Sequence, residues 1–440
     1  MKRVLIALTA VALAAGAFAQ VDYESVDPSG QTINFWHQHG GIREAMLNEI
    51  VADFNATNPW GITVVAENQG GYDDIFNKML VLMGTRDVPD LVVAYQNQAA
   101  TYQLVDGLID IWPLVRSPRW GYSEEELGDF FQGFLQSDVN PAFDNALLGF
   151  PPHRSMEVMY YNEAWLAELG ADGPPRTPAE FADLVCKAAE QPFSGAVGGG
   201  RSLGYEIDLD ASRFASWTFA FGGNIFDYEA ERYSLVSDAA PIAAMYFLQD
   251  LTRRGCMDIV TERRGDQANF GVGTTLFGIA SSSGLPFWGS AVEAGADFAW
   301  SVAPLPHITS EPVMNLYGAS VSMPAGLGAE RQVATWLFLK FYTSPEVQAR
   351  WAQASNYFPA RASVAAGLGD YFDANPAYGT AFALLPYGIA EPPVPGYDFV
   401  RSLIATEMAA ILDGADVIAT LTAVEAEANA ILADQLAALD

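Results

Sequence analysis

The sequence predicts an α/β fold of two lobes that face each other across a cleft, and three observations lead to that prediction. The mature chain of about 420 residues exceeds what a single hydrophobic core usually organises, so two domains are expected. Short apolar runs of strand length alternate with helical patterns, which indicates mostly parallel sheets. Strand patterns resume after long excursions, so the chain is expected to cross between the lobes several times. Two such lobes can close on each other by a hinge motion.

The N-terminus has the three parts of a secretory signal. Lys2 and Arg3 form a positive start, residues 4–15 form a short apolar core, and Ala17-Phe18-Ala19 is a small-x-small cleavage site. The apolar core is too short to cross a membrane, which takes about 20 residues. We therefore expect residues 1–19 to be a cleaved signal peptide and the mature protein to be periplasmic or otherwise extracytoplasmic.

After the signal, strand and helix patterns alternate. Apolar residues recur at helical spacing from Ile42 to Phe54, whereas the run Asp90–Ala94 is typical of a buried strand. We expect strands over Thr32–His37, Ile62–Ala66 and Asp90–Ala94, and helices over Ile42–Phe54 and Asp73–Met83. This alternation is typical of a parallel sheet covered by helices.

The same alternation continues further along the chain. Val158 and Tyr160 mark a strand over Glu157–Asn162. The expected helices are Glu163–Leu169, Pro178–Glu190, Ala239–Arg254, Glu330–Tyr342 and the segment from Ser402 onward, with a Gly-rich loop over Gln191–Gly204. We place the first lobe at residues 20–150 and 318–356, and the second lobe at residues 151–317 and 357–440.

The charge of the chain limits its partners. It has 53 acidic and 22 basic residues, for a formal net charge of −31. Such a surface repels nucleic acid and anionic membranes and favours solubility, so we expect no nucleic-acid partner and a monomeric protein. A chain this acidic that binds an anion has to do so with a few well-placed groups.

The chain has two cysteines, Cys186 and Cys256. In an oxidising compartment an even pair indicates a disulfide. The alternative is two buried thiols that act as small apolar residues.

Catalytic and metal-binding motifs are weak. The sequence has no Gly-x-Ser-x-Gly elbow, His-Glu-x-x-His helix or Gly-x-x-x-x-Gly-Lys phosphate loop. His37 and His39 would share one face of a strand, but without a third metal ligand in view a pocket wall is the better interpretation. A secreted hydrolase is the less favoured alternative, because nothing singles out a catalytic pair among the 53 acidic residues. We therefore expect a protein without enzymatic activity, cofactor or metal.

Motifs spread along the mature chain resemble one family. They are Asn34–His37, Gly71–Asp74, Val88–Leu91, Val158–Asn162, Tyr317–Ser320, Phe341–Glu346 and Asn356–Ala360. As a set they are similar to the periplasmic solute-binding proteins of the sugar-importer type. The resemblance implies the two-lobed periplasmic-binding-protein fold, with a hinge and an interlobe ligand cleft. It also implies a small-molecule ligand and, as partners, the transmembrane permease subunits of an ABC importer.

Within that family the likeness is strongest to the proteins that bind glycerol-3-phosphate or a glycerophosphodiester. The resemblance implies ligand-binding roles for Tyr72, Gln96, Ser155, Ser282 or Ser283, Gly318, Tyr357 and Arg401. Gln96 stands where that group has a glutamate, and Asp208, with Tyr205 nearby, stands where it has a tryptophan. These departures alter the end of the pocket that receives the glycerol.

The residue types at these positions suggest two ligand chemistries. A guanidinium offers five donors in a planar fork, so Arg401 is expected to bind a phosphate or, alternatively, to pair with nearby acids. Asp208 beside aromatic rings would suit a quaternary ammonium, which predicts a glycerophosphodiester such as glycerophosphocholine. The further stacking candidates are Trp36, Tyr205 and Trp288. The alternative ligand is a neutral di- or oligosaccharide, which needs no dominant arginine.

Overall fold

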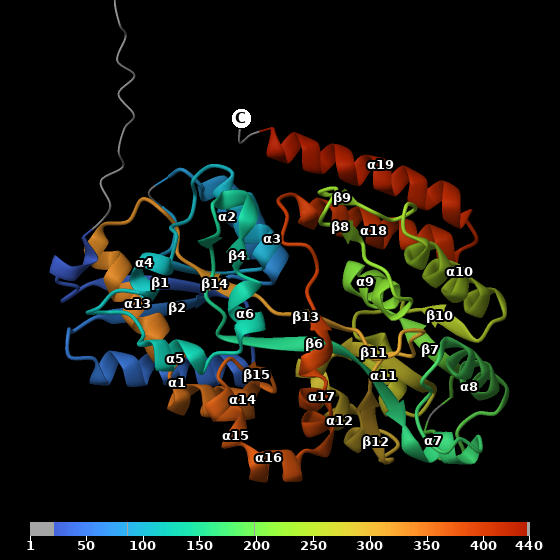
Figure 1. The fold of residues 1–440 in the computed structure, drawn as a ribbon. Coiled ribbons are helices and arrows are strands. Elements are labelled where there is room, and N and C mark those ends of the chain that lie inside the picture. The colour runs from blue at the N-terminus through green and yellow to red at the C-terminus, as the bar shows by residue number, and fades with distance from the viewer. Residues whose placement is uncertain (1–21, 86, 198, 438–440) are drawn as a thin grey trace, which may run out of the picture.

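The protein folds into two α/β lobes that lie side by side, and Figure 1 shows the long strand β6 running between them. The computed structural model describes residues 22–85, 87–197 and 199–437. The predicted signal peptide, residues 1–19, lies outside these described residues. Each lobe has its own sheet with helices packed on it, so the prediction of a two-lobed α/β fold is confirmed.

The first lobe is built on a four-stranded sheet of order β14-β3-β1-β2. Its strands are β1 (Thr32–His37), β2 (Thr63–Asn68), β3 (Leu91–Ala94) and β14 (Ser320–Ser322), and its first helices are α1 (Ile42–Thr57), α2 (Tyr72–Leu82) and α3 (Gln96–Gln103). β1 runs parallel to β2 and β3, whereas β14 pairs antiparallel with β3. Because the parallel strands point the same way, α2 and α3 both begin at their carboxyl ends, where open α/β sheets bind ligands.

The second lobe has a sheet of order β10-β7-β11-β6-β13-β16, to which β12 and β15 add by pairing with β6. Its strands are β6 (His153–Asn162), β7 (Leu203–Ile207), β10 (Met257–Ile259), β11 (Thr275–Ser281), β12 (Trp300–Ala303), β13 (Met314–Tyr317), β15 (Phe358–Pro359) and β16 (Gly388–Ile389). Two short hairpins stand apart from it: β4 (Val139–Asn140) with β5 (Ala146–Leu147), and β8 (Phe226–Asp227) with β9 (Arg232–Tyr233).

Strand β6 carries the chain from the first lobe into the second. At its start Arg154 lies opposite Phe358 of β15, and Ser155 lies opposite Tyr317 of β13. Its later residues pair with β11 and β12 inside the second lobe. The three passages of the chain between the lobes therefore meet at one place. A hinge motion can bend this short shared segment while each sheet stays intact.

The remaining helices cover the two sheets. They are α4 (Trp112–Val115), α5 (Glu124–Gly128), α6 (Gln132–Gln136), α7 (Glu163–Glu168), α8 (Pro178–Glu190), α9 (Ala211–Ala220), α10 (Ala239–Arg253), α11 (Gly265–Gly271), α12 (Leu285–Ala294), α13 (Ala329–Tyr342), α14 (Pro345–Ser355), α15 (Ala362–Ala366), α16 (Gly369–Ala374), α17 (Pro376–Ala383), α18 (Tyr397–Leu412) and α19 (Val417–Leu436). In Figure 1, α13 and α14 return to the first lobe, and α18 and α19 lie over the second. Within the described ranges, no helix combines the length and the apolar character needed to cross a membrane.

Several predicted bounds differ from the observed ones by a few residues, with β6 beginning at His153 and not at Glu157, and two further regions differ in their elements. Strand β7 begins at Leu203, inside the loop predicted over Gln191–Gly204, because pairing with β10 and β11 extends it. The predicted C-terminal helix begins earlier, at Tyr397, and is divided near Gly414, whose φ of +107° is incompatible with a continuing helix. The division lets α18 and α19 pack on each other, which buries the apolar faces of both.

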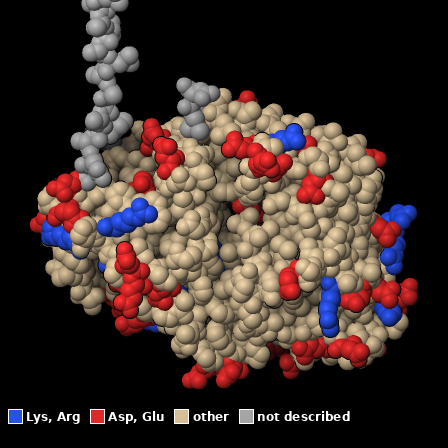
Figure 2. All heavy atoms as spheres, viewed as in Figure 1, with Lys and Arg blue, Asp and Glu red and all other residues tan. Residues whose placement is uncertain are grey.

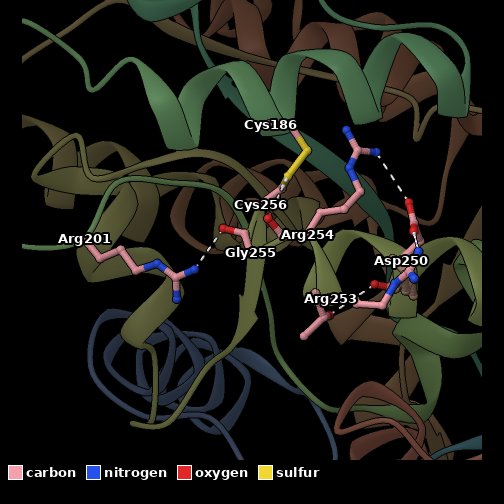
Figure 3. The surroundings of a disulfide bond; sticks show 9 residues. Cys186, Arg201, Asp250, Arg253, Arg254, Gly255 and Cys256 are labelled. Carbon is pink, nitrogen blue, oxygen red and sulfur yellow. Dashed lines mark hydrogen bonds and ion pairs between the residues drawn. A yellow bond between two sulfur atoms is a disulfide. The ribbon is translucent and has the colours of Figure 1, made fainter.

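A disulfide joins Cys186 of α8 to Cys256, the residue before β10, as one of the two alternatives predicted (Figure 3). The bond closes a loop between residues 70 positions apart in the sequence. In the chain-entropy model a loop of this length adds roughly 4 kcal/mol to the free energy of unfolding. Both cysteines belong to the second lobe, so the bond acts on that lobe directly.

The lobe boundaries given above remain a prediction.

The acidic surface is plain in the structure: Figure 2 shows acidic side chains spread over both lobes, with fewer basic ones, and a hollow between the lobes. This spread leaves the visible face without a basic patch that could hold a polyanion.

Candidate functional site

A cavity of about 240 Å³ lies between the two lobes. One wall comes from the start of α3 in the first lobe, directly after strand β3. The opposite wall comes from the second lobe: the segment before α9, the end of β11, β13, and the Pro-rich segment that leads into α18. The cavity therefore stands where the fold predicts a ligand, outside the carboxyl ends of the parallel strands.

The first-lobe wall carries no formal charge. It consists of Tyr95, Gln96 and Asn97, the N-cap and first residues of α3. Burial raises the pKa of the Tyr95 phenol well above its usual range, so this hydroxyl stays protonated. Amides and a phenol can donate and accept hydrogen bonds, which suits an uncharged polar ligand.

The second-lobe wall is densely charged. Its charged lining residues are Asp208, Asp210, Arg213, Glu391, Asp398 and Arg401. Asp210 is the N-cap of α9, where its carboxylate accepts from the backbone N–H of Ser212 at 2.7 Å. Burial tends to raise the pKa of Asp210, but Arg401 and Arg213 outweigh it and hold the pKa below its usual value. Four carboxylates face two guanidinium groups, so the wall is acidic.

Arg401 is fully engaged by acids of its own lobe. Its Nη1 donates to Glu391, and its Nη2 donates to Asp210 Oδ1 at 2.9 Å and to Ser212 Oγ at 3.1 Å. Glu391 in turn accepts from the hydroxyls of Ser212 and Tyr397 at 2.6 and 2.7 Å. The ion-pair alternative predicted for Arg401 is therefore the arrangement that the structure shows.

Arg213 is paired behind the wall with Glu157 of strand β6. Glu157 is completely buried and also accepts from Tyr317 Oη at 3.0 Å and Ser216 Oγ at 3.1 Å. Burial raises the pKa of Glu157, and the guanidinium of Arg213 opposes that shift. Neither arginine of the cavity is thus an unpaired cation.

Asp398 joins the two lobes at the edge of the cavity. Asn97 donates to one oxygen of its carboxylate, and Gln98 Nε2 donates to the other at 3.2 Å. Burial raises the pKa of Asp398 to about 6. Nearby, the backbone N–H of Gly396 donates to Thr101 Oγ1 of the first lobe at 3.0 Å. These contacts hold α18 against α3.

A groove of about 350 Å³ adjoins the cavity. It shares Asp210, Asp398 and Arg401 with the cavity, and its outer part is lined by Phe76 and Phe399. The two apolar rings come from different lobes and lie 6.2 Å apart. A ligand longer than the cavity can extend along this groove.

Three of the residues predicted to bind ligand line this one cavity: Gln96, Asp208 and Arg401. Tyr72 lies next to it, with its ring 4.8 Å from that of Tyr95, and its hydroxyl accepts from Gln38 at 2.9 Å. Tyr357 lies deeper, with its ring 4.0 Å from His153. The ligand roles of these residues remain predictions.

The predicted serines and the glycine form hydrogen bonds and close backbone contacts in or beside the segments that cross between the lobes. Ser155 Oγ donates to the Tyr317 carbonyl at 3.3 Å, and Ser282 Oγ accepts from the Met156 N–H at 3.2 Å. Ser283 bonds to the Ser281 hydroxyl, and it is Ser281 that lines the cavity. Gly318 has φ of +151°, and an added Cβ would meet the backbone of Arg154 at 3.2 Å. A glycine is therefore needed there for backbone packing between two crossings.

The three further stacking candidates do not reach the cavity. Tyr205 is fully buried on β7, where it packs against Phe181. Trp288 is stacked on Tyr160 at 4.3 Å in the core of the second lobe. Trp36 lies on the first-lobe sheet, where it donates to Glu67. None of the three rings is among the residues that line the cavity, and their ligand roles remain predictions.

Several lining residues were missed from the sequence, above all Asp210, Glu391 and Asp398. Asp210-Ala-Ser212 is an N-cap pattern that could have marked the start of α9. Glu391 begins a Pro-rich segment and Asp398 stands in the first turn of α18. No local signal indicates that these three acids converge.

His37 and His39 of the first lobe and His153 at the start of β6 form a buried cluster. The rings of His37 and His39 lie 5.9 Å apart, as do those of His39 and His153, and Trp351 Nε1 donates to His153 Nδ1 at 3.0 Å. Across the part of the chain that the structure describes, no group of three or more His, Cys, Asp or Glu residues is arranged to hold a metal ion.

Comparison with known proteins agrees with this geometry. Residues 49–380 match the family model of the bacterial extracellular solute-binding proteins. The sn-glycerol-3-phosphate-binding periplasmic protein UgpB of Escherichia coli K12 is 24% identical over 358 residues, which cover 80% of this chain and 78% of that protein. UgpB of Shigella flexneri is 23% identical over the same length.

Solved structures share the fold. UgpB from Mycobacterium tuberculosis, in complex with glycerophosphocholine, is 25% identical and superposes with a TM-score of 0.77, covering 93% of this chain and all of the other. The GacH receptor of Streptomyces glaucescens, solved unliganded and with acarbose, gives 0.76 at 18% identity, covering 92% and 99%. The sugar-binding protein MalE from Xanthomonas citri gives 0.75 at 20% identity, covering 92% and 98%.

Proposed function

The chain belongs to the bacterial extracellular solute-binding proteins, and from that premise we propose that it captures a small neutral polyhydroxylated solute, such as a mono- or disaccharide, in the interlobe cavity. We propose further that it works as a monomer outside the cytoplasm. Its partners would be the permease subunits of an ABC importer, as the named periplasmic relatives suggest.

The observation that carries the ligand proposal is the state of Arg401. Its two terminal nitrogens already donate to Glu391, Asp210 and Ser212. A dianionic phosphate would have to displace a carboxylate from the guanidinium and then sit among the remaining acids of the same wall. Like charges brought together in a partly buried site repel strongly, so the arrangement disfavours a phosphate monoester.

A neutral polyol meets no such penalty. Its hydroxyls can donate to Asp208 and Asp210, and hydrogen bonds to charged acceptors contribute roughly 1.5–3 kcal/mol each. Tyr95, Tyr317 and Tyr397 give the cavity apolar ring faces beside its polar groups. Alternating polar edges and apolar faces are also what a sugar ring presents.

A glycerophosphodiester with a cationic end is the second candidate. Asp208 lines the cavity, and among the described residues it has no hydrogen-bond or ion-pair partner. A quaternary ammonium near Asp208 would balance part of the acidic wall, which a phosphate monoester cannot do. The glycerophosphocholine complex of the M. tuberculosis relative supports this candidate.

A thermal-shift panel separates these ligands, since a ligand at about 100 times its Kd stabilises by about 2.7 kcal/mol. The panel contains glucose, maltose, trehalose, glycerophosphocholine and sn-glycerol 3-phosphate. We expect a sugar to raise Tm, and its affinity, measured by calorimetry, to change little with ionic strength. Stabilisation by sn-glycerol 3-phosphate alone would overturn the proposal.

The variant Arg401→Met tests the role of the arginine. For a sugar ligand we expect a loss of affinity of about tenfold, because Glu391 and Asp210 lose the cation that orients them. For a phosphate ester the loss would be complete. Arg254→Met, which removes a half-exposed arginine of the same lobe, is the matched control and should leave affinity unchanged.

A further inference from the structure

The amide of Gln96 is held in one orientation by groups that can only accept. Gln96 Nε2 donates to Asp138 Oδ1 at 3.0 Å and lies 3.4 Å from the carbonyl oxygen of Gly318. A carboxylate and a backbone carbonyl have no proton to offer to the other end of an amide. The reversed amide would bring its oxygen against the carboxylate of Asp138, so that orientation is excluded.

The third neighbour of Gln96 Nε2 is also an acceptor. Ser320 Oγ lies 3.3 Å away, and its own proton is already donated to Asp138 Oδ2 at 2.6 Å. The lone pairs that remain on this hydroxyl face Gln96 and the guanidinium of Arg154. All the polar atoms around the amide nitrogen therefore favour the same orientation.

Arg154 fixes Asp138 in turn. The two form an ion pair at 2.7 Å, with both side chains 2% exposed, and Arg154 also bonds to Ser137 Oγ and the Phe134 carbonyl. Arg154 belongs to β6 and Ser320 to β14, which are two of the crossing strands. The network that orients Gln96 is thus anchored on strands of the lobe crossing.

The amide oxygen of Gln96 is the atom left for the ligand. Gln96 lines the cavity, and no donor among the described residues reaches its Oε1. We propose that Gln96 is a specificity-determining residue and Asp138 its positioning residue. Together they present a hydrogen-bond acceptor at the first-lobe wall and select a ligand that places a hydroxyl or an N–H group there.

The first-lobe wall then selects a ligand by whether it donates or accepts a hydrogen bond at Gln96, and not by its charge. A hydroxyl of a sugar can donate to Gln96 Oε1, whereas a phosphate oxygen or an ether oxygen would meet it as acceptor against acceptor. A site built to bond a donor strongly disfavours a ligand that lacks one, because the protein's acceptor is left without a partner. The selectivity half of this inference rests on the proposed function, but the amide orientation does not.

The orientation is tested first, without ligand, on the full chain labelled with ¹⁵N-glutamine. The Gln96 side-chain signal is assigned by its loss in Gln96→Met. We expect its NH₂ protons to exchange with solvent at least tenfold more slowly than those of Gln353, an exposed residue of α14. We also expect faster exchange in Ser320→Ala. Exchange as fast as that of Gln353 would overturn the inference, whatever the ligand is.

The selectivity is tested by calorimetry with maltose and its monofluorinated deoxy analogues. Replacing the hydroxyl that faces Gln96 with fluorine removes the donor, so one analogue should bind the wild type about 5- to 10-fold more weakly than maltose. The same analogue should lose almost nothing in Gln96→Met, whereas Gln353→Met should behave like the wild type. Equal losses in wild type and Gln96→Met for every analogue would overturn the assigned role. Failure of maltose to bind would count against the proposed function and leave the exchange result standing.

Asp138→Asn tests the positioning residue. The new amide can donate to Gln96 Oε1 and so lets Gln96 turn its NH₂ group to the cavity. We expect the affinity for maltose to fall and that for the fluorinated analogue, which has no donor at this point, to rise relative to the wild type. Because this change also removes the carboxylate partner of Arg154, Ser320→Ala serves as the variant that folds with less risk. An unchanged ratio of the two affinities in both variants would overturn the role of the network.

Discussion

Two regions beside strand β6 bury polar groups in opposite ways. The second lobe buries a charged pair, Glu157 with Arg213, and surrounds Glu157 with further hydrogen bonds. The other region holds His37 and His39 of the first lobe and His153 at the start of β6, which are buried with their rings beside one another and beside Trp351. Burial lowers the pKa of His37 to about 4 and those of the other two well below their usual range, so the cluster is neutral at pH 7.

The difference shows two ways in which a titratable side chain can be buried despite the cost of removing its charge from water. A group taken out of water either keeps its charge beside an opposite charge or gives the charge up. Glu157 keeps its charge beside Arg213, as Asp138 does beside Arg154, whereas the three histidines are neutral. The ion pair and the histidine cluster should therefore respond differently to loss of a charge and to pH.

The largest effect is expected from Arg213→Met, which removes the cation of the buried ion pair with Glu157. It leaves the Glu157 carboxylate buried without its cation, at a cost of roughly 3–5 kcal/mol in the free energy of unfolding. Urea unfolding followed by tryptophan fluorescence measures the loss. Arg253→Met is the matched control, since it removes an exposed ion pair with Asp250 and should cost less than about 0.5 kcal/mol. A loss no larger than that of the control would contradict the prediction.

An intermediate effect is expected from acid on the first lobe. The folded histidines bind protons more weakly than in the unfolded chain, so their contribution to stability is complete above about pH 6.5 and is lost as the pH falls towards 4. We expect His37 alone to account for a loss of about 2–3 kcal/mol over this window. Hydrogen exchange should show it first in peptides from β1 and α1, and His37→Phe should reduce it.

The control for the acid prediction is His307→Gln, which changes the fourth histidine, a residue outside the cluster. It should leave the pH dependence as it is in the wild type. If acid loosens the second lobe first, the assignment of the effect to the histidine cluster is wrong.

The smallest effect is expected where the two lobes meet, at Asp398. Burial raises its pKa to about 6, so its contribution to stability is complete below about pH 4 and is lost as the pH rises through 6. Asp398→Asn removes the buried charge and keeps one acceptor oxygen, which can bond to Asn97 or to Gln98 but not to both. We expect it to stabilise the protein by about 1 kcal/mol at pH 7.5 and not at pH 4, as measured by Tm. Asp413→Asn, at the exposed end of α18, should show no such difference.

Local pattern was enough for the elements that bury one face. Helix Pro178–Glu190 and strand Thr32–His37 have the predicted bounds, because a Thr-Pro start with Glu180 as capping partner and a short β-rich run are local signals. Strand β7 was not predicted, and the predicted loop overlaps its first residues, because β7 is buried on both faces and so lacks the alternating pattern of a one-sided strand.

The sequence by itself predicted two α/β lobes, offered a disulfide as one of two states of its cysteines, and through a family resemblance named Gln96, Asp208 and Arg401 as residues of the cleft. Only the tertiary structure decided what those residues can do. Arg401 meets Asp210 across 191 positions of sequence, and Gln96 meets Asp138 across 42. Hydrogen bonds and charge pairing act through space over a few ångströms, so the partner that neutralises an arginine or orients an amide is set by the fold and not by neighbouring letters.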